Sequence, residues 1–124
     1  MYSHNMVGSN DIAASKTFYD AVFAAVGGKP GIVDAKGRLI YMHNGGMFMV
    51  TKPIDGKPAT VGNGCTIGLA MDSTEQADAW HAAGAANGGT AIEDAPGWRE
   101  MGEMKLYLAY LRDPAGNKLC ALYR

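Results

Sequence analysis

Two similar stretches of the chain indicate an internal repeat. Residues 11–28 read DIAASKTFYDAVFAAVGG, and residues 73–89 read STEQADAWHAAGAANGG. When they are aligned, Phe18-Tyr19 falls on Trp80-His81 and Gly27 falls on Gly89, an offset of 62 residues in a chain of 124. An offset of half the chain length is typical of a duplicated structural unit.

Each stretch has the apolar spacing of an amphipathic helix. The first helix is expected to begin at Asn10 or Asp11 and to end at Gly27-Gly28. In the second, Ser73 and Gln76 fit a capping box. The residues expected to face the core are Ser15, Phe18, Tyr19, Val22, Phe23 and Val26 in the first helix, and Ala77, Trp80 and Gly84 in the second.

Strand-like segments surround the two helices in the same order, with one before each helix and three after it. Turn signals at residues 44–46 and 113–117 separate the last two strands of each half, and a longer loop is expected over 95–104. The expected strands span residues 2–8, 31–34, 38–43 and 46–51 in the first half, and 65–71, 90–93, 105–112 and 117–123 in the second.

This order predicts an α+β fold made of two βαβββ modules. The modules span residues 1–52 and 64–124, and a linker over residues 53–63, which contains proline and glycine, joins them. Together they form one domain over residues 1–124, a usual length for a single domain.

Composition excludes several classes of protein. Hydrophobic residues make up 48% of the chain and charged residues 19%, as in an ordered globular core rather than a disordered chain. The net charge of −1 argues against a nucleic-acid-binding protein, and no apolar run approaches the ~20 residues that cross a membrane. The N-terminus lacks the features of a signal peptide, and two cysteines are too few for a disulfide scaffold. We therefore expect a cytoplasmic protein.

Several short motifs resemble one known family. The most specific runs from Arg112 to Lys118 and reads RDPAGNK; His4, the segment DIAAS over 11–15, Phe18-Tyr19, APG over 95–97 and YLAY over 107–110 agree with it. Together they resemble the vicinal oxygen chelate superfamily of glyoxalases, bleomycin resistance proteins and extradiol dioxygenases. The resemblance implies that curved mixed sheets surround a shared cavity with the helices outside. It also implies that metal-dependent members hold a divalent ion with four side chains in that cavity.

The four ligand positions of the family fall on His4, Met49, Thr66 and Cys120, with His43 and Thr51 as alternatives to Met49. Only His4 is a usual ligand type, because the family commonly has histidine at the third position and glutamate at the fourth. A thioether is a poor ligand for hard or borderline ions. We therefore expect no metal cofactor, although His4 and Cys120 are both competent zinc ligands.

Other residues are candidates for the cavity wall. Arg99 is either an anion-binding group or a surface arginine, and Trp98 either stacks on a ligand or anchors its loop. Tyr107 and Tyr110 have opposite strand phase, so at most one faces the cavity. Cys65 is expected to be a buried core thiol. The residues predicted to contact a ligand are His4, Met49, Thr66, Trp98, Arg99, Tyr107 and Cys120.

Three functions compete. The first is a small-molecule-binding protein that works without the usual metal, with its ligand in the cavity between the modules. The second is a metal-dependent lyase or dioxygenase of the same superfamily, and the third is a domain that binds a protein partner. We expect the first, with no nucleic-acid or membrane partner. We also expect a homodimer, in which the modules pair within one chain or swap between chains.

Overall fold

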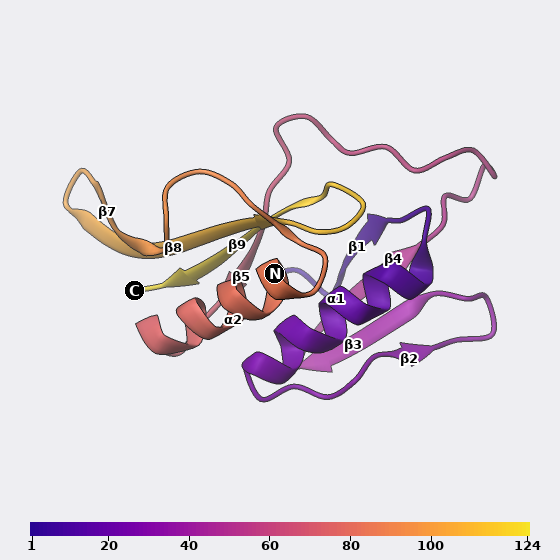
Figure 1. Ribbon diagram of the computed structural model, residues 1–124, viewed down its shortest axis with the longest axis horizontal. Coiled ribbons are helices and arrows are strands. Elements are labelled where there is room, and N and C mark those ends of the chain that lie inside the picture. The colour runs from indigo at the N-terminus through magenta and orange to yellow at the C-terminus, as the bar shows by residue number, and fades with distance from the viewer.

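The fold repeats one arrangement of strands and a helix twice along the chain. The computed structural model describes residues 1–124. The first half contains β1 (Asn5–Gly8), α1 (Ile12–Ala25), β2 (Ile32–Val33), β3 (Leu39–His43) and β4 (Gly46–Thr51). The second contains β5 (Ile67–Ala70), α2 (Thr74–Ala86), β6 (Thr90–Ala91), β7 (Gly97–Met101), β8 (Met104–Arg112) and β9 (Lys118–Tyr123) (Figure 1).

The strands form two mixed sheets with the same topology. The first sheet has the order β1-β4-β3-β2, and the second has the order β5-β9-β8-β6 with β7 paired to β8. In each sheet the strand before the helix runs parallel to the last strand of the half, and the other pairs are antiparallel. The predicted α+β fold of repeated βαβββ units is confirmed, with two open sheets rather than a closed barrel.

Local interactions explain where each helix begins. The Asp11 carboxylate accepts a hydrogen bond from the Ala14 N–H at 3.0 Å, and the Ser73 hydroxyl accepts one from the Gln76 N–H at 3.0 Å. The Gln76 side chain binds the N–H of Asp72 rather than that of Ser73, so the predicted capping box is shifted by one residue. Neither helix is long and apolar enough to cross a membrane.

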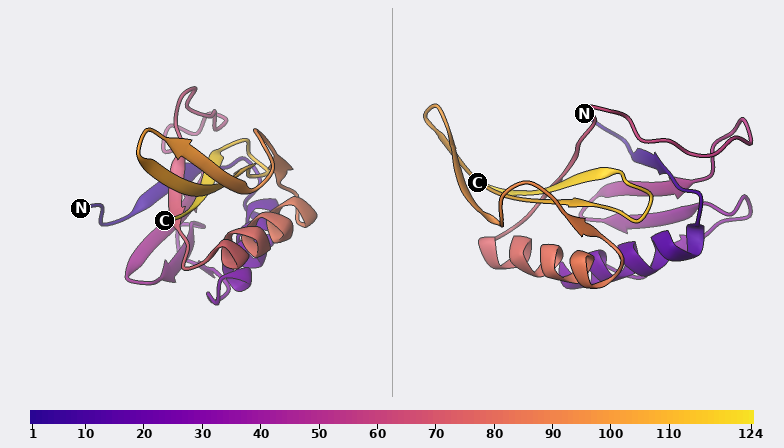
Figure 2. Two further views of the ribbon diagram at one scale, coloured as in Figure 1. Left: turned by 90° about the vertical axis from the view of Figure 1, so that its left-hand side faces the viewer. Right: turned by 45° about the horizontal axis from the view of Figure 1, so that its top comes forward.

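Both helices lie on the same side of the two sheets and pack against each other (Figure 2). Gly84 of α2 allows this close approach, because a Cβ there would lie 2.3 Å from Leu111 Cδ1 and 3.0 Å from the ring of Phe18. Phe18, Tyr19 and Trp80 are almost fully buried in a core that continues across both modules. The predicted core faces of both helices are thus confirmed, with Val26 only half-buried.

A buried carboxylate connects the two modules. Asp113, in the turn between β8 and β9, accepts a hydrogen bond from the Tyr19 hydroxyl of α1 at 2.6 Å and three more from Ala115 and Asn117. The Asn117 amide also donates to the Gly8 carbonyl of β1 at 2.9 Å. Burial, and then the Asp113 charge, raise the pKa of Tyr19 well above its ordinary value, so Tyr19 remains a neutral donor.

Two local predictions are wrong. Residues 97–101 form β7 and not a loop, because a turn at Gly102 (φ +63°) folds them back onto β8. Cys65 is exposed rather than buried, because it ends a turn in which its N–H bonds to the Gly62 carbonyl, and β5 begins only at Ile67.

Replacing Asp113 should destabilise the whole domain. Asp113→Ala leaves the buried Tyr19 hydroxyl and the backbone N–H of Asn117 without their acceptor, so we expect the free energy of unfolding to fall by about 3 kcal/mol. Chemical denaturation monitored by fluorescence measures this change. Asp55→Ala, at an exposed position of the linker, is the matched control and should stay within about 0.5 kcal/mol of the wild type. A loss no larger than that of the control would contradict the assigned role of Asp113.

Candidate functional site

Each sheet has one side turned away from the helices, which we call its free face. On the free face of the first sheet, Met6 and Ile40 lie on either side of Met49, and Met42 lies opposite Met47. The other side carries the residues that pack on α1, such as Phe48 and Val50. Met42 is 61% exposed and Met6 is 41% exposed. Methionine is flexible and polarisable, so this surface is suited to an apolar ligand or partner.

The free face of the second sheet is apolar at its centre and charged at its edge. Leu106, Leu108 and Cys120 form a small buried cluster, against which Tyr110 and Leu122 pack. Lys118 lies over the Tyr110 ring, 4.9 Å from its centroid, and pairs with Glu93.

Arg99 reaches the free face of the second sheet from β7, because it lies opposite Leu106 in the register of β7 and β8. Its guanidinium donates to the carbonyls of Asp94 and Ala95 at 3.1 and 3.0 Å. These hydrogen bonds hold the segment that precedes β7 against Arg99, and the guanidinium places a positive charge at the edge of this face.

The structure separates the predicted ligand contacts into three groups. Arg99 and Cys120 lie on the free face of the second sheet, and Met49 lies on that of the first. His4 and Thr66 are exposed residues just before β1 and β5, and the Ser3 hydroxyl lies 2.9 Å from His4 Nδ1. Trp98 and Tyr107 lie on the opposite, helix-facing side of the second sheet.

Trp98 and Tyr107 connect the β7–β8 hairpin to α2. Their rings meet edge to face with centroids 5.4 Å apart, and Tyr123 packs beside them. The Tyr107 hydroxyl donates to the Asp78 carboxylate at 2.6 Å, and this hydrogen bond raises the pKa of Tyr107. Strand alternation allows only one of Tyr107 and Tyr110 to face the predicted ligand side, and in the structure Tyr110 is the one on the free face.

The residues at the four family ligand positions do not fit a divalent ion. Burial raises the pKa of the Cys120 thiol, which therefore stays protonated at neutral pH. Met49 offers a thioether and Thr66 a neutral hydroxyl, so His4 is the one ordinary ligand among the four. No group of three or more His, Cys, Asp or Glu side chains in the chain could hold a metal ion.

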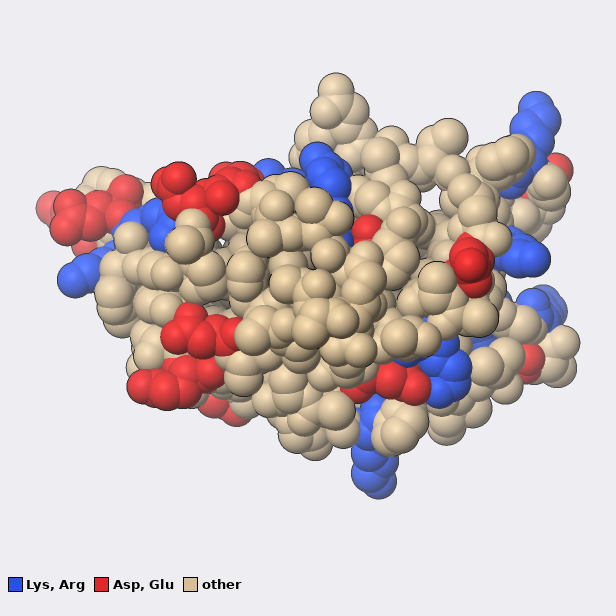
Figure 3. Space-filling model, in the orientation of Figure 1, with Lys and Arg blue, Asp and Glu red and all other residues tan.

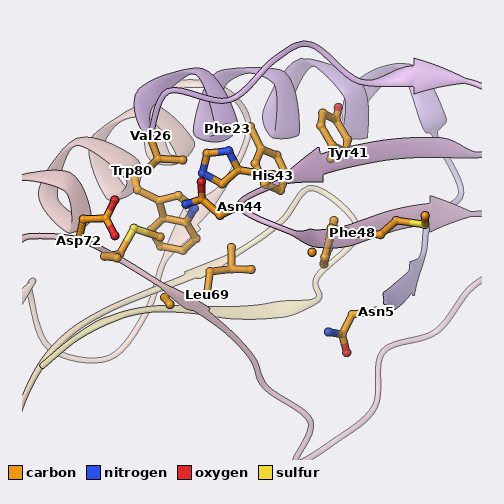
Figure 4. Close-up of a pocket in the computed structure, with 14 residues that line it drawn as sticks. Asn5, Phe23, Val26, Tyr41, His43, Asn44, Phe48, Leu69, Asp72 and Trp80 are labelled. Atoms are coloured by element: carbon orange, nitrogen blue, oxygen red, sulfur yellow. The ribbon is translucent and has the colours of Figure 1, made fainter. Parts of the chain in front are cut away.

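A separate pocket of about 390 Å³ lies between the modules on the helix side of the sheets. It is lined by Phe23, Tyr41 and Phe48 from the first module and by Leu69 and Trp80 from the second (Figure 4). None of the seven predicted contacts lines it. The sequence placed Trp80 on the helix face that packs inward, but nothing in the sequence indicated that space remains beside the ring.

The whole chain is similar to solved structures of one family. A model of the Glyoxalase/Bleomycin resistance protein/Dioxygenase superfamily matches residues 2–121. A glyoxalase/bleomycin resistance protein from Albidiferax ferrireducens T118 is 56% identical, with a TM-score of 0.95, and the match covers 100% of this chain and 99% of that one.

More distant structures share the fold. A glyoxalase/bleomycin resistance protein/dioxygenase family enzyme from Burkholderia phytofirmans PsJN is 20% identical, with a TM-score of 0.73 and coverage of 98% of this chain and 96% of that one. A lactoylglutathione lyase from Agrobacterium tumefaciens is 19% identical, with a TM-score of 0.67 and coverage of 97% and 91%. Among curated proteins, none matches the chain significantly.

The two cysteines should differ strongly in reactivity. Cys120 is 4% exposed and has a raised pKa, whereas Cys65 is exposed, so we expect iodoacetamide to modify Cys65 at least about tenfold faster at neutral pH. Because the pKa of Cys120 is raised, its modification should accelerate only above the ordinary thiol pKa of ~8.5. Mass spectrometry of peptides measures both rates, and guanidinium chloride should make them equal. Equal rates in the folded protein would contradict the buried thiol.

Proposed function

Because the chain belongs to the Glyoxalase/Bleomycin resistance protein/Dioxygenase superfamily, we propose that it binds a small organic ligand on the free faces of its sheets without the usual divalent metal. This proposal rests on the chemistry of the side chains at the four ligand positions. His4 is the single histidine there, and the other three positions carry a thioether, a hydroxyl and a protonated thiol. A Lewis acid that stabilises an anionic intermediate needs a complete set of ligands, and this chain does not provide one.

The chemistry of the free faces suggests the kind of ligand. Tyr110, Met6 and Met42 offer apolar and aromatic contact, and Arg99 places a positive charge at the edge of the second sheet. A compound with an apolar body and an acidic or carbonyl group matches this arrangement. The metal-dependent lyase or dioxygenase remains the alternative, and the ligand set disfavours it.

Screening by thermal shift tests the proposal. Among aromatic, quinone-like and short acidic compounds, we expect ligands that stabilise the protein, and Tyr110→Ala should weaken them about fivefold or more because it removes the ring at the centre of the free face. Ala24→Ser, on the exposed side of α1, is the matched control. Protein purified without a histidine tag should contain far less than one nickel, zinc, iron or manganese ion per chain. A stoichiometric metal, or no stabilising compound, would count against the proposal.

We further propose that the free faces are covered in a homodimer. The chain exposes 7288 Å², whereas a compact monomer of 13.1 kDa is expected to expose about 6,400 Å². The excess of about 900 Å² is close to the ~800 Å² that each partner buries in a standard interface. A ligand on a free face would then lie between two copies.

The two unpaired thiols support a reducing compartment such as the cytoplasm.

The dimer can be tested by light scattering after size exclusion. We expect twice the monomer mass of 13.1 kDa for the wild type at micromolar concentration. Met42→Arg places a charge on the free face of the first sheet and should shift the protein to the monomer. Ala24→Arg, on the exposed side of α1, should leave the dimer unchanged. A monomeric wild type, or equal effects of the two variants, would contradict a dimer through the free faces.

A further inference from the structure

A second pocket, of about 550 Å³, lies where the segment that precedes β5 meets the turn between β8 and β9. It is lined by residues 61–66, Arg112, Gly116 and Lys118. Residues 61–66 are all exposed, and Arg112 and Lys118 are half-buried, so a ligand can reach these side chains. No acidic residue lines the pocket, and both of its charged residues are basic.

The two basic residues lie directly opposite each other on the free face of the second sheet. Arg112 pairs with Lys118 in the register of β8 and β9, so both side chains leave the sheet on the same side. This side is the free face, because Lys118 lies over the ring of Tyr110. Like charges at directly opposed positions destabilise a sheet. Negative charge beside this pair therefore stabilises it.

The protein supplies a partner for only one of the two basic residues. Glu93 pairs with Lys118 at an N–O distance of 2.5 Å. Arg112 takes part in no ion pair, and it donates a hydrogen bond to the Gly116 carbonyl at 2.8 Å. The carboxylate of Asp113, the next residue, is buried on the helix side of the sheet. Arg112 thus keeps an uncompensated positive charge at the pocket.

The guanidinium of Arg112 is held in place and still has donors to offer. A guanidinium carries five N–H groups in a planar fork that matches the oxygens of a carboxylate or a phosphate. The Gly116 carbonyl uses one of these groups and fixes the orientation of the side chain. The N–H groups of Gly62, Asn63 and Gly64 form no backbone hydrogen bond, so they add further donors at the pocket.

The distribution of charge over the surface agrees with this assignment. In Figure 3, acidic side chains gather at the end of the molecule where α2 and the β7–β8 hairpin lie. Basic side chains are visible where the segment before β5 meets the β8–β9 turn. Arg99 does not belong to this pocket, because it lies opposite Leu106, toward the other end of β8.

We propose that this pocket binds the oxyanion of a small molecule, either a carboxylate or a phosphate group. Arg112 holds two of its oxygens, and Lys118, which Glu93 already neutralises, borders the site on the side of Tyr110. The inference rests on the proposed function and makes it more specific, since a ligand held here by its acidic group extends along the free face toward Tyr110. It selects anionic compounds over neutral carbonyl compounds.

Inorganic phosphate tests the pocket without the body of a ligand. At constant ionic strength and neutral pH, we expect phosphate to shift the ¹⁵N–¹H backbone signals of residues 62–66 and of Gly116 in a saturable way. Arg112→Gln removes the charge and the fork, and should weaken phosphate about fivefold. Lys29→Gln, at an exposed position of the first module, is the matched control and should bind phosphate like the wild type.

The alkylation rate of Cys65 reports on the same pocket. Cys65 lines the pocket and is exposed. Positive charge beside it raises the local concentration of iodoacetate, which is an anion, but not that of neutral iodoacetamide. We expect Arg112→Gln to lower the ratio of the two rates about threefold and Lys29→Gln to leave it unchanged. Phosphate should protect Cys65 of the wild type from iodoacetate.

Aromatic acids separate this inference from the proposed function. Benzoate and phenyl phosphate should bind more tightly than acetate and inorganic phosphate, and Tyr110→Ala should remove this gain. Comparing the two aromatic acids shows which oxyanion the pocket prefers. If phosphate binds and the ring adds nothing, the ligand surface on the free face is wrong and the anion site stands. If neutral aromatic compounds bind and phosphate does not, the anion site is wrong and the ligand surface stands.

The inference is overturned if phosphate gives no saturable shift, if Arg112→Gln binds phosphate as tightly as the wild type, or if phosphate leaves the alkylation of Cys65 unchanged. The wild-type titration and the protection of Cys65 decide the question even if Arg112→Gln fails to fold.

Discussion

The Asp113 carboxylate accepts hydrogen bonds from its own turn and from Tyr19 of the other module, and the remaining packing depends on this contact. It holds the β8–β9 turn against the start of the first module, where Asn117 also reaches the Gly8 carbonyl. A buried carboxylate is tolerated only when hydrogen bonds satisfy it. The four donors around Asp113 meet that requirement, and they fix how α1 lies relative to the second sheet.

With the modules fixed in this way, both helices cover the same side of the two sheets. Gly84 lets α2 approach α1 and Leu111, so the two halves share one core instead of forming two small ones. Each sheet is therefore left with a free face that the helices do not cover, which carries Met42 and Met6 in one module and Tyr110 in the other. The duplication thus produces two free faces and a pocket at the junction of the modules.

Strand and helix positions were readable from the sequence because turns and caps are local. The helix N-caps at Asp11 and Ser73 and the turn between Asp113 and Asn117 lie where the sequence predicts them. β7 was missed because an exposed edge hairpin needs no regular apolar alternation. The sequence predicts both Trp98 and Tyr107 as ligand contacts, whereas the register of β7 and β8 pairs them on the side of the sheet that faces α2.

The sequence by itself determined the family and the repeated βαβββ order, because both depend on residue types and short spacings. The tertiary structure alone decided which residues share a face. A shift of one residue in strand register moves each side chain to the opposite face of the sheet. It placed Tyr110 beside Cys120 and Trp98 beside Tyr107. It also decided that Trp80 borders a pocket with its indole N–H unpaired, because empty space depends on how distant segments pack and not on any local pattern.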